Sequence, residues 1–256
     1  MTTFYDVIKR VARQIADART GVATGGSTTT LIDTLMDEPD EYYNSGLLFI
    51  DHTVPVIVKV TDYDLATHTF TFATSTVVAA GKKYTVIDER FPLDVLKQAI
   101  NQALVEDIGQ IMGIDESLVP AEGQERYALP ADVYDIRRVE IGEEDSSWDI
   151  NYAWSEELGE LRFQGNLPSV DQTIRVHYVH THEEMIDLDD VIDDQVPLDL
   201  LIHAASVYAL QWRMVKVREN EPGLKDKFLF NETRAIIARS KGKKQLLNRD
   251  PILSRW

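Results

Sequence analysis

The residues best suited to metal chemistry lie close together near position 180. His177, His180 and His182 precede Glu183 and Glu184, and imidazole and carboxylate groups are ordinary ligands of zinc. Alternate residues of a strand share a face, so His180 and His182 could hold one cation. A strand end that enters an acidic segment carries the same residue types without any ligand, and we favour this second interpretation.

Other candidate groups are the acidic pairs Asp189-Asp190 and Asp193-Asp194. Paired carboxylates can do acid–base work or bind calcium, but the spacing D-x-[DN]-x-[DN]-G is absent. We therefore interpret both pairs as solvated acidic residues. Ser206 has no G-x-S-x-G motif around it, and nearby His203 is predicted to lie in the core or at an interface of its helix.

The glycine-rich segment from Gly21 to Ser27 does not fit a nucleotide site. A P-loop requires G-x-x-x-x-G-K-[ST], and this segment has no lysine. The chain also has no cysteine, which excludes disulfides, thiolate metal sites and cysteine nucleophiles. We therefore expect a protein that is not an enzyme, with no metal and no cofactor.

Charge is unevenly distributed along the 256 residues, which carry 43 acidic and 26 basic side chains and a formal charge of −17. Residues 213–256 hold twelve of the lysines and arginines but only five of the acids, so an acidic body has a basic C-terminal end. One interpretation of such an end is that it binds an anionic partner, either nucleic acid or an acidic protein surface. The other is that its charges lie on solvated helix faces. The acidic body argues against DNA wrapping, because each neutralised phosphate requires a lysine or arginine.

The sequence predicts four helices, which would help to position the candidate side chains described above. In each of them apolar residues recur three or four positions apart, which is the spacing of one buried helix face. Proline can occupy the first position of a helix, and Gly113 is expected to end the second one. The predicted helices span residues 4–18, 92–112, 197–218 and 224–240.

Alternation of apolar and polar residues predicts two groups of antiparallel strands. The first lies between residues 46 and 88, with hairpin turns at Asp62–Asp64 and Ala79–Lys82. The second spans roughly residues 125–181. The small polar stretch Thr20–Thr30 suits a loop or linker that precedes the first group.

The order of these elements predicts an α+β fold. Its body would be a discontinuous helical bundle with two inserted antiparallel β modules and an extended C-terminal arm. We expect the bundle at residues 1–20, 91–118 and 196–241, a small β-barrel or sandwich at 21–90, the second β module at 119–195, and the arm at 242–256. No apolar run reaches eighteen residues and the first residues lack a signal-peptide pattern, so we expect an intracellular protein.

Several runs of the sequence are informative together. They are GSTTTLID at residues 26–33, DEYYNSGLLFI at 40–50, VTDYD at 60–64, TFTF at 69–72, HAASVYALQWR at 203–213 and RDPILSRW at 249–256. These runs resemble head-to-tail adaptor proteins (neck or head completion proteins) of tailed bacteriophages. In that family a threonine-rich linker precedes D-x-Y-x-N-x-G and a β module whose hairpin reads V-T-D-Y-D. The resemblance covers most of the chain in outline.

The resemblance implies a structural virion protein. It would form a ring of twelve copies beneath the capsid portal, contact a tail, tail-terminator or neck protein, and pass double-stranded DNA through its lumen without sequence-specific binding. An acidic wall suits that passage because it repels DNA. The expected location is the neck of the virion, after synthesis in the host cytoplasm, without a membrane partner.

The C-terminal arm is the part expected to bind the portal. It combines basic residues with apolar and aromatic ones, which favours docking into a protein groove, between neighbouring portal subunits, over sliding on phosphate. The residues expected to bind are Leu246, Leu247, Arg249, Asp250, Pro251, Ile252, Leu253, Arg255 and Trp256. Two alternatives stay open, namely an interaction protein of the tail or baseplate and a virion-associated hydrolase that uses the carboxylates or the histidines.

Overall fold

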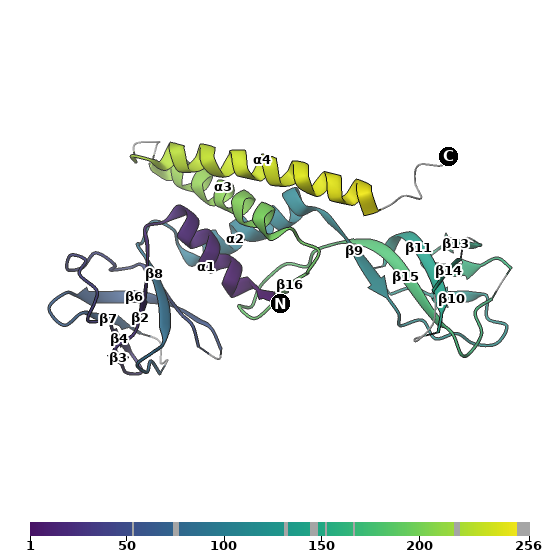
Figure 1. Cartoon of the computed structure of the whole chain (residues 1–256), viewed down its shortest axis with the longest axis horizontal. Helices are drawn as coiled ribbons and strands as arrows, with labels where there is room; N and C mark the ends of the chain where they lie inside the picture. Colours follow the sequence, from purple (N-terminus) through teal and green to yellow (C-terminus); the bar gives the residue numbers. More distant parts are fainter. Residues whose placement is uncertain are drawn as a thin grey trace. The chain divides into compact units, whose positions relative to one another are not determined.

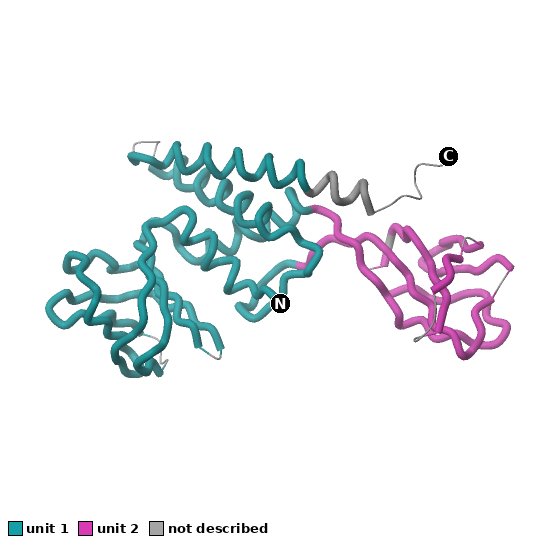
Figure 2. Tube along the Cα trace, in the orientation of Figure 1, with its two compact units in different colours: residues 1–108, 184–256 teal, residues 109–183 magenta. Residues whose placement is uncertain are grey.

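The computed structural model divides the chain into two compact units (Figure 2). Unit 1 comprises residues 1–108 and 184–256, and unit 2 comprises residues 109–183. The structure describes residues 1–52, 54–73, 77–130, 133–143, 148–151, 153–165, 167–217 and 221–249, with the backbone alone at 134 and 242–249. Across these residues no helix combines the length and apolar character needed to cross a membrane.

Seven strands of unit 1 form one antiparallel sheet, in the order β2-β8-β5-β6-β7-β4-β3. Figure 1 labels β2, β3, β4, β6, β7 and β8 of this sheet. Its core contains Tyr43, Tyr63, Phe70 and Tyr84, whose neighbouring ring centroids are 4.7 to 5.8 Å apart. Buried aromatic pairs of this kind dominate the energy of a small core. The strands are β2 (Ala18–Val22), β3 (Gly25–Gly26), β4 (Thr30–Ile32), β5 (Leu47–Ile50), β6 (Val56–Asp64), β7 (Thr69–Phe72) and β8 (Lys83–Ile87).

Two predictions about this sheet are wrong, and a third is confirmed in part. The stretch Thr20–Thr30 is not a loop, because its backbone pairs with β8 and β7 and contributes to three strands. The segment Asp62–Asp64 is not a turn, because it ends β6; the turn follows at Leu65–His68. A turn does lie at Ala79–Lys82, where the N–H of Lys82 donates to the carbonyl of Ala79, but it is not a hairpin turn, because β8 pairs with β2 and β5 and not with β7.

Four helices accompany this sheet in unit 1. α1 (Phe4–Ile15) begins with a capping box, in which Thr3 and Asp6 exchange side-chain to backbone hydrogen bonds. α3 (Leu198–Val217) contacts α1, α2 (Leu93–Ala103) and α4 (Leu224–Arg249). Two short strands, β1 (Thr2–Thr3) and β16 (Val191–Ile192), pair at the start of α1.

The predicted helical bundle is wrong as a description of the fold. The described residues contain four α-helices and four antiparallel sheets, the largest with seven strands, so the fold is mixed α and β. The second predicted helix is one source of the error. Its apolar spacing continues to Ile111, but α2 ends at Ala103, a π-helical turn η1 (Leu104–Ile108) follows, and Gly109 with φ of 68° leads into a strand.

The prediction of an extended arm at residues 242–256 is also wrong for part of that range. α4 continues to Arg249, so residues 242–249 are helical. This stretch is rich in lysine, glutamine and leucine, which favour helix, and the first proline comes only at Pro251. Residues 250–256 lie outside the described residues.

Unit 2 consists of two antiparallel sheets, in the orders β12-β11-β15-β9 and β10-β14-β13. They share a core that includes Tyr127, Val139, Leu161, Phe163 and Ile174. The strands are β9 (Gln110–Asp115), β10 (Arg126–Ala128), β11 (Tyr134–Gly142), β12 (Asp149–Asn151), β13 (Trp154–Glu157), β14 (Glu160–Phe163) and β15 (Thr173–Thr181). Unit 2 thus has a hydrophobic core of its own.

Candidate interaction surface

Helix α4 has two apolar faces, and only one of them is covered in the described structure. Leu224, Asn231 and Ala235 are buried on the side that packs on α3. The rest of its surface, which we call the outer face of α4, leaves between 42% and 58% of four large apolar side chains exposed. Phe230 lies at the edge of this face, because its ring centroid is 6.1 Å from that of His203 on α3. The outer face comprises Leu229, Phe230, Ile236 and Ile237 together with the exposed cations Lys225, Arg234 and Lys241.

The composition of the outer face is typical of a contact surface for another protein. Interface centres are enriched in aromatic residues and arginine, and Arg234 lies over the ring of Phe230 at 5.3 Å. A row of exposed apolar side chains on one helix also lowers solubility unless a partner covers it. The arrangement therefore favours binding over chemistry.

Ion pairs on Arg90 fix the α3–α4 hairpin to the rest of unit 1. Arg90 Nη2 lies 2.5 Å from carboxylate oxygens of Asp17 and Asp88, and Nη1 lies 2.9 Å from Glu221 Oε1. Glu221 also accepts a hydrogen bond from Arg213 Nε at 2.8 Å. Because Asp17 follows α1, Asp88 follows β8 and Glu221 precedes α4, one guanidinium group joins three parts of the unit.

This network also sets the ionisation of its acids. Burial alone would raise the pKa of Glu221, but hydrogen bonds from Arg90 and Arg213 bring that pKa below its ordinary value. The pKa of Asp17 is lowered in the same way, against burial, by Arg90 and Lys227. Both carboxylates are ionised at neutral pH, so they hold the elements together and transfer no protons.

A second anchor of α4 lies at the π-helical turn. Tyr208 Oη on α3 is 2.9 Å from a carboxylate oxygen of Glu106 and 2.9 Å from one of Asp107, and Arg239 on α4 forms an ion pair with Asp107. Burial, followed by the hydrogen bond to Glu106, raises the pKa of Tyr208 to about 12, so its hydroxyl stays protonated and donates. π-Helical turns are frequent at functional sites, and here the turn positions α4.

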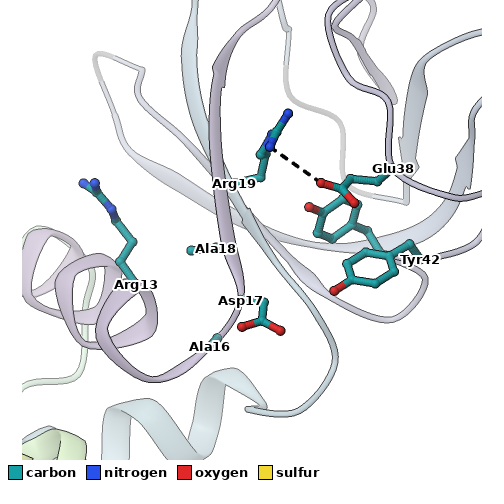
Figure 3. A pocket seen from close by; sticks show the side chains of 8 residues that line it. Arg13, Ala16, Asp17, Ala18, Arg19, Glu38 and Tyr42 are labelled. Atoms are coloured by element: carbon teal, nitrogen blue, oxygen red, sulfur yellow. Dashed lines mark ion pairs between the residues drawn. The ribbon is translucent and has the colours of Figure 1, made fainter. Parts of the chain in front are cut away.

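A hollow of about 330 Å³ opens beside the end of α1 (Figure 3). Its charged lining is paired apart from Arg13, since Arg19 lies 3.2 Å from Asp37 and 3.8 Å from Glu38, and Asp17 belongs to the Arg90 network. Tyr42, which also lines the hollow, is 43% exposed. Such self-paired groups leave little charge for a ligand.

The structure does not bring together the three histidines that were considered as metal ligands. His177 Nε2 lies 2.8 Å from Glu140, whereas His180 and His182 form hydrogen bonds with main-chain carbonyls. Because β15 ends at Thr181, the alternation that would place His180 and His182 on one face stops before His182. Within the described residues, no group of three or more histidines and carboxylates could hold a metal ion.

The other candidate residues have roles in the fold. Asp190 accepts the N–H groups of Ile186 and Asp187 at 2.7 and 2.8 Å, which shapes a turn. Ser206 is buried and donates to the carbonyl of Ile202. His203 lies 2.9 Å from Asn231 on α4, which confirms its predicted place at a helix interface.

Gly21, in the segment tested for a nucleotide site, has a packing role. The hydroxyl of Tyr84 donates to Asp33 at 2.6 Å, and both residues are buried. A Cβ atom at position 21 would lie 2.4 Å from the Asp33 carboxylate and 2.6 Å from that hydroxyl. The buried hydrogen bond thus requires glycine beside it.

The residues predicted to bind the portal are divided by the end of the described structure. Leu246, Leu247 and Arg249 belong to the last turns of α4, whereas Asp250, Pro251, Ile252, Leu253, Arg255 and Trp256 lie outside the described residues. The outer face of α4 was not predicted from the sequence. The sequence does contain a pattern that indicates it, because the apolar pairs Leu229-Phe230 and Ile236-Ile237 recur seven positions apart, in addition to the apolar residues that pack on α3.

Comparison with models of known protein families gives no match for this chain, and a search among curated proteins gives none either. A functional conclusion therefore depends on the surfaces described above and on the resemblance of the sequence runs.

Proposed function

We propose that this chain is a structural adaptor protein in the neck of a tailed bacteriophage. Twelve copies form a ring that connects the capsid portal to the tail, and double-stranded DNA passes through the lumen of the ring. The sequence runs at residues 26–33, 40–50 and 60–64 support this proposal by their resemblance to such proteins. The excess of acidic residues supports it as well, because an acidic channel wall repels DNA.

The outer face of α4 is the observation that carries the proposal. Four exposed apolar side chains and three cations lie on one helix, and that helix is held by ion pairs near its start, at Glu221, and further along, at Arg239. A binding surface on a fixed element loses little conformational freedom when it binds. We assign the outer face and the following residues 242–256 to contact with the portal.

Electron microscopy of portal rings mixed with the protein tests this assignment. The wild type should add density of matching rotational symmetry to one face of the portal. A chain that ends at residue 241 and the variant Leu229→Ser/Ile236→Ser, at positions 46% and 58% exposed, should both lose that density. The matched control is Leu35→Ser/Val54→Ser, which removes two apolar side chains, 82% and 69% exposed, at a distance from α4 in the sequence and should bind as the wild type does.

The outcomes separate the proposal from its alternatives. If the wild-type protein leaves portal rings unchanged but binds isolated tails or baseplates, the chain is a tail interaction protein. If the control variant loses binding as completely as the α4 variant, the outer face is not the contact surface.

A further inference from the structure

Two arginines of α1 differ from the other arginines whose side chains the structure describes. Arg10 and Arg13 are exposed and take part in no ion pair or ring contact within the described residues. Ten other arginines each have an acidic partner or lie over an aromatic ring. Within the described residues these two neighbouring arginines have no acidic partner, although the chain holds 43 acidic residues, so two guanidinium groups are available to an external anion.

These arginines line a hollow of about 380 Å³ between α1 and α3. Its lining residues are Arg10, Arg13 and Gln14 of α1 and Asp199, Ile202 and His203 of α3. The buried amide of Asn231 orients the histidine, because Asn231 Nδ2 donates to the carbonyl of Lys227 and Oδ1 therefore accepts from His203 Nδ1. Nε2 is then the ring nitrogen left for a ligand.

The lining suits an acidic peptide better than a free phosphate. Two guanidinium groups and the Gln14 amide can donate to carboxylates, and Ile202 offers an apolar contact. Asp199 would repel a compact dianion, but its carboxylate can accept main-chain N–H groups of a bound peptide. An acidic polypeptide offers carboxylates to the arginines and Gln14, main-chain N–H groups to Asp199 and apolar side chains to Ile202.

The chain itself contains such a peptide, at residues 184–194. Glu184, Asp187 and Asp189 are exposed there, and Ile186 and Val191 are 64% and 49% exposed. The segment thus carries carboxylates and apolar side chains in alternation, which complements both kinds of group in the hollow.

The segment does not line the hollow of its own subunit. The N–H groups of Phe4 and Tyr5 donate to the carbonyls of Asp190 and Leu188 at 2.8 and 3.0 Å, which fixes the segment at the start of α1. Arg13 lies nine residues further along the helix, or about 13 Å at the rise of an α-helix. The exposed side chains of the fixed segment are therefore available to the hollow of another copy.

We infer that the hollow between α1 and α3 binds residues 184–194 of a second copy of this chain. The two surfaces are different parts of one subunit, so the contact is head to tail, which is the type of contact that closes into a ring. The inference rests on the proposed function for the ring itself, but recognition of the segment can be measured without a portal.

A labelled peptide of residues 184–194 tests the inference by fluorescence anisotropy with the full-length protein at low salt. We expect saturable binding that weakens with added salt, because the contact is between charges, and that weakens about tenfold or more in Arg10→Ala/Arg13→Ala, which removes two charge-assisted contacts. The matched control Lys59→Ala/Lys83→Ala removes the same charge from two exposed positions of the seven-stranded sheet, β6 and β8, and should bind the peptide as the wild type does. A peptide with amides in place of its carboxylates should not bind.

Three results would overturn the inference. They are the absence of saturable peptide binding, an equal loss in both protein variants, and binding of inorganic phosphate in the hollow without binding of the peptide. The portal experiment is independent of this one. Peptide binding without portal binding would reject the neck assignment and keep the head-to-tail contact, whereas portal binding without peptide binding would do the reverse.

Discussion

The packing of Gly21 leaves no room for a side chain in the seven-stranded sheet. We expect Gly21→Ala to lose about 1–3 kcal/mol of unfolding free energy, because it disturbs the buried hydrogen bond between Tyr84 and Asp33. Gly25→Ala is the control, since a Cβ atom there would meet only Ile32, at 3.9 Å. Urea unfolding of both variants measures the difference, and equal stability would show that the sheet adjusts around position 21.

The residues that we assign to binding were only partly accessible to sequence analysis. Helical spacing places Arg10 and Arg13 away from the buried stripe of α1. Nothing in the spacing, however, brings them to Ile202 and His203, which lie far along the chain. That convergence is a tertiary property, and so is the absence of an acidic partner for either arginine among the residues that the structure describes.

At the scale of elements, the sequence pattern predicted a helix or strand correctly where it fitted only one kind of secondary structure. α3 was predictable almost to the residue, because Pro197 precedes a long apolar repeat without a competing pattern. Thr20–Thr30 was not, because small polar residues form strands only when neighbouring strands supply hydrogen-bonding partners. Ile111 was ambiguous, since it fits both helical spacing and the alternation of β9.

The junction of α1, β8 and α4 should weaken in acid. Glu221 has a pKa below its ordinary value of 4.5 in the folded chain, so its ion pairs stabilise the fold fully above that value and are lost as the pH falls through the lowered pKa. At pH 7 we expect Glu221→Gln to cost about 1–2 kcal/mol, since charge-assisted hydrogen bonds are replaced by neutral ones.

The pH dependence of the difference is the test of this explanation. Melting temperatures of wild type and Glu221→Gln should differ at pH 7, and the difference should shrink as the pH falls below 4.5 and through the lowered pKa of Glu221, where the wild-type carboxyl becomes protonated. Glu232→Gln, an exposed acid on α4, is the control and should follow the wild type throughout. A difference that stays constant down to the pH at which the wild type unfolds in acid would mean that the charge of Glu221 is not what stabilises the junction.

At the scale of the whole molecule, the chain leaves and re-enters unit 1 at adjacent points. β9 and β15 pair antiparallel, with Gln110 opposite Thr181 and Asp115 opposite Val176. The two ends of residues 109–183 are therefore held together by main-chain hydrogen bonds within unit 2 itself. This is the topology of an inserted domain, whose ends lie close together and whose core is its own.

We therefore expect residues 109–183 to fold as an isolated fragment. Its core holds Tyr127, Leu161 and Phe163 at 3% exposure or less, although a fragment of this size buries a smaller share of its surface than a larger domain and has correspondingly modest stability. Far-UV circular dichroism should show strand structure with one cooperative melting transition. The matched control, residues 116–183, lacks β9 and should melt at a lower temperature, because β15 then becomes an uncovered edge strand. A fragment 109–183 without a cooperative transition would mean that unit 2 requires unit 1 for its stability.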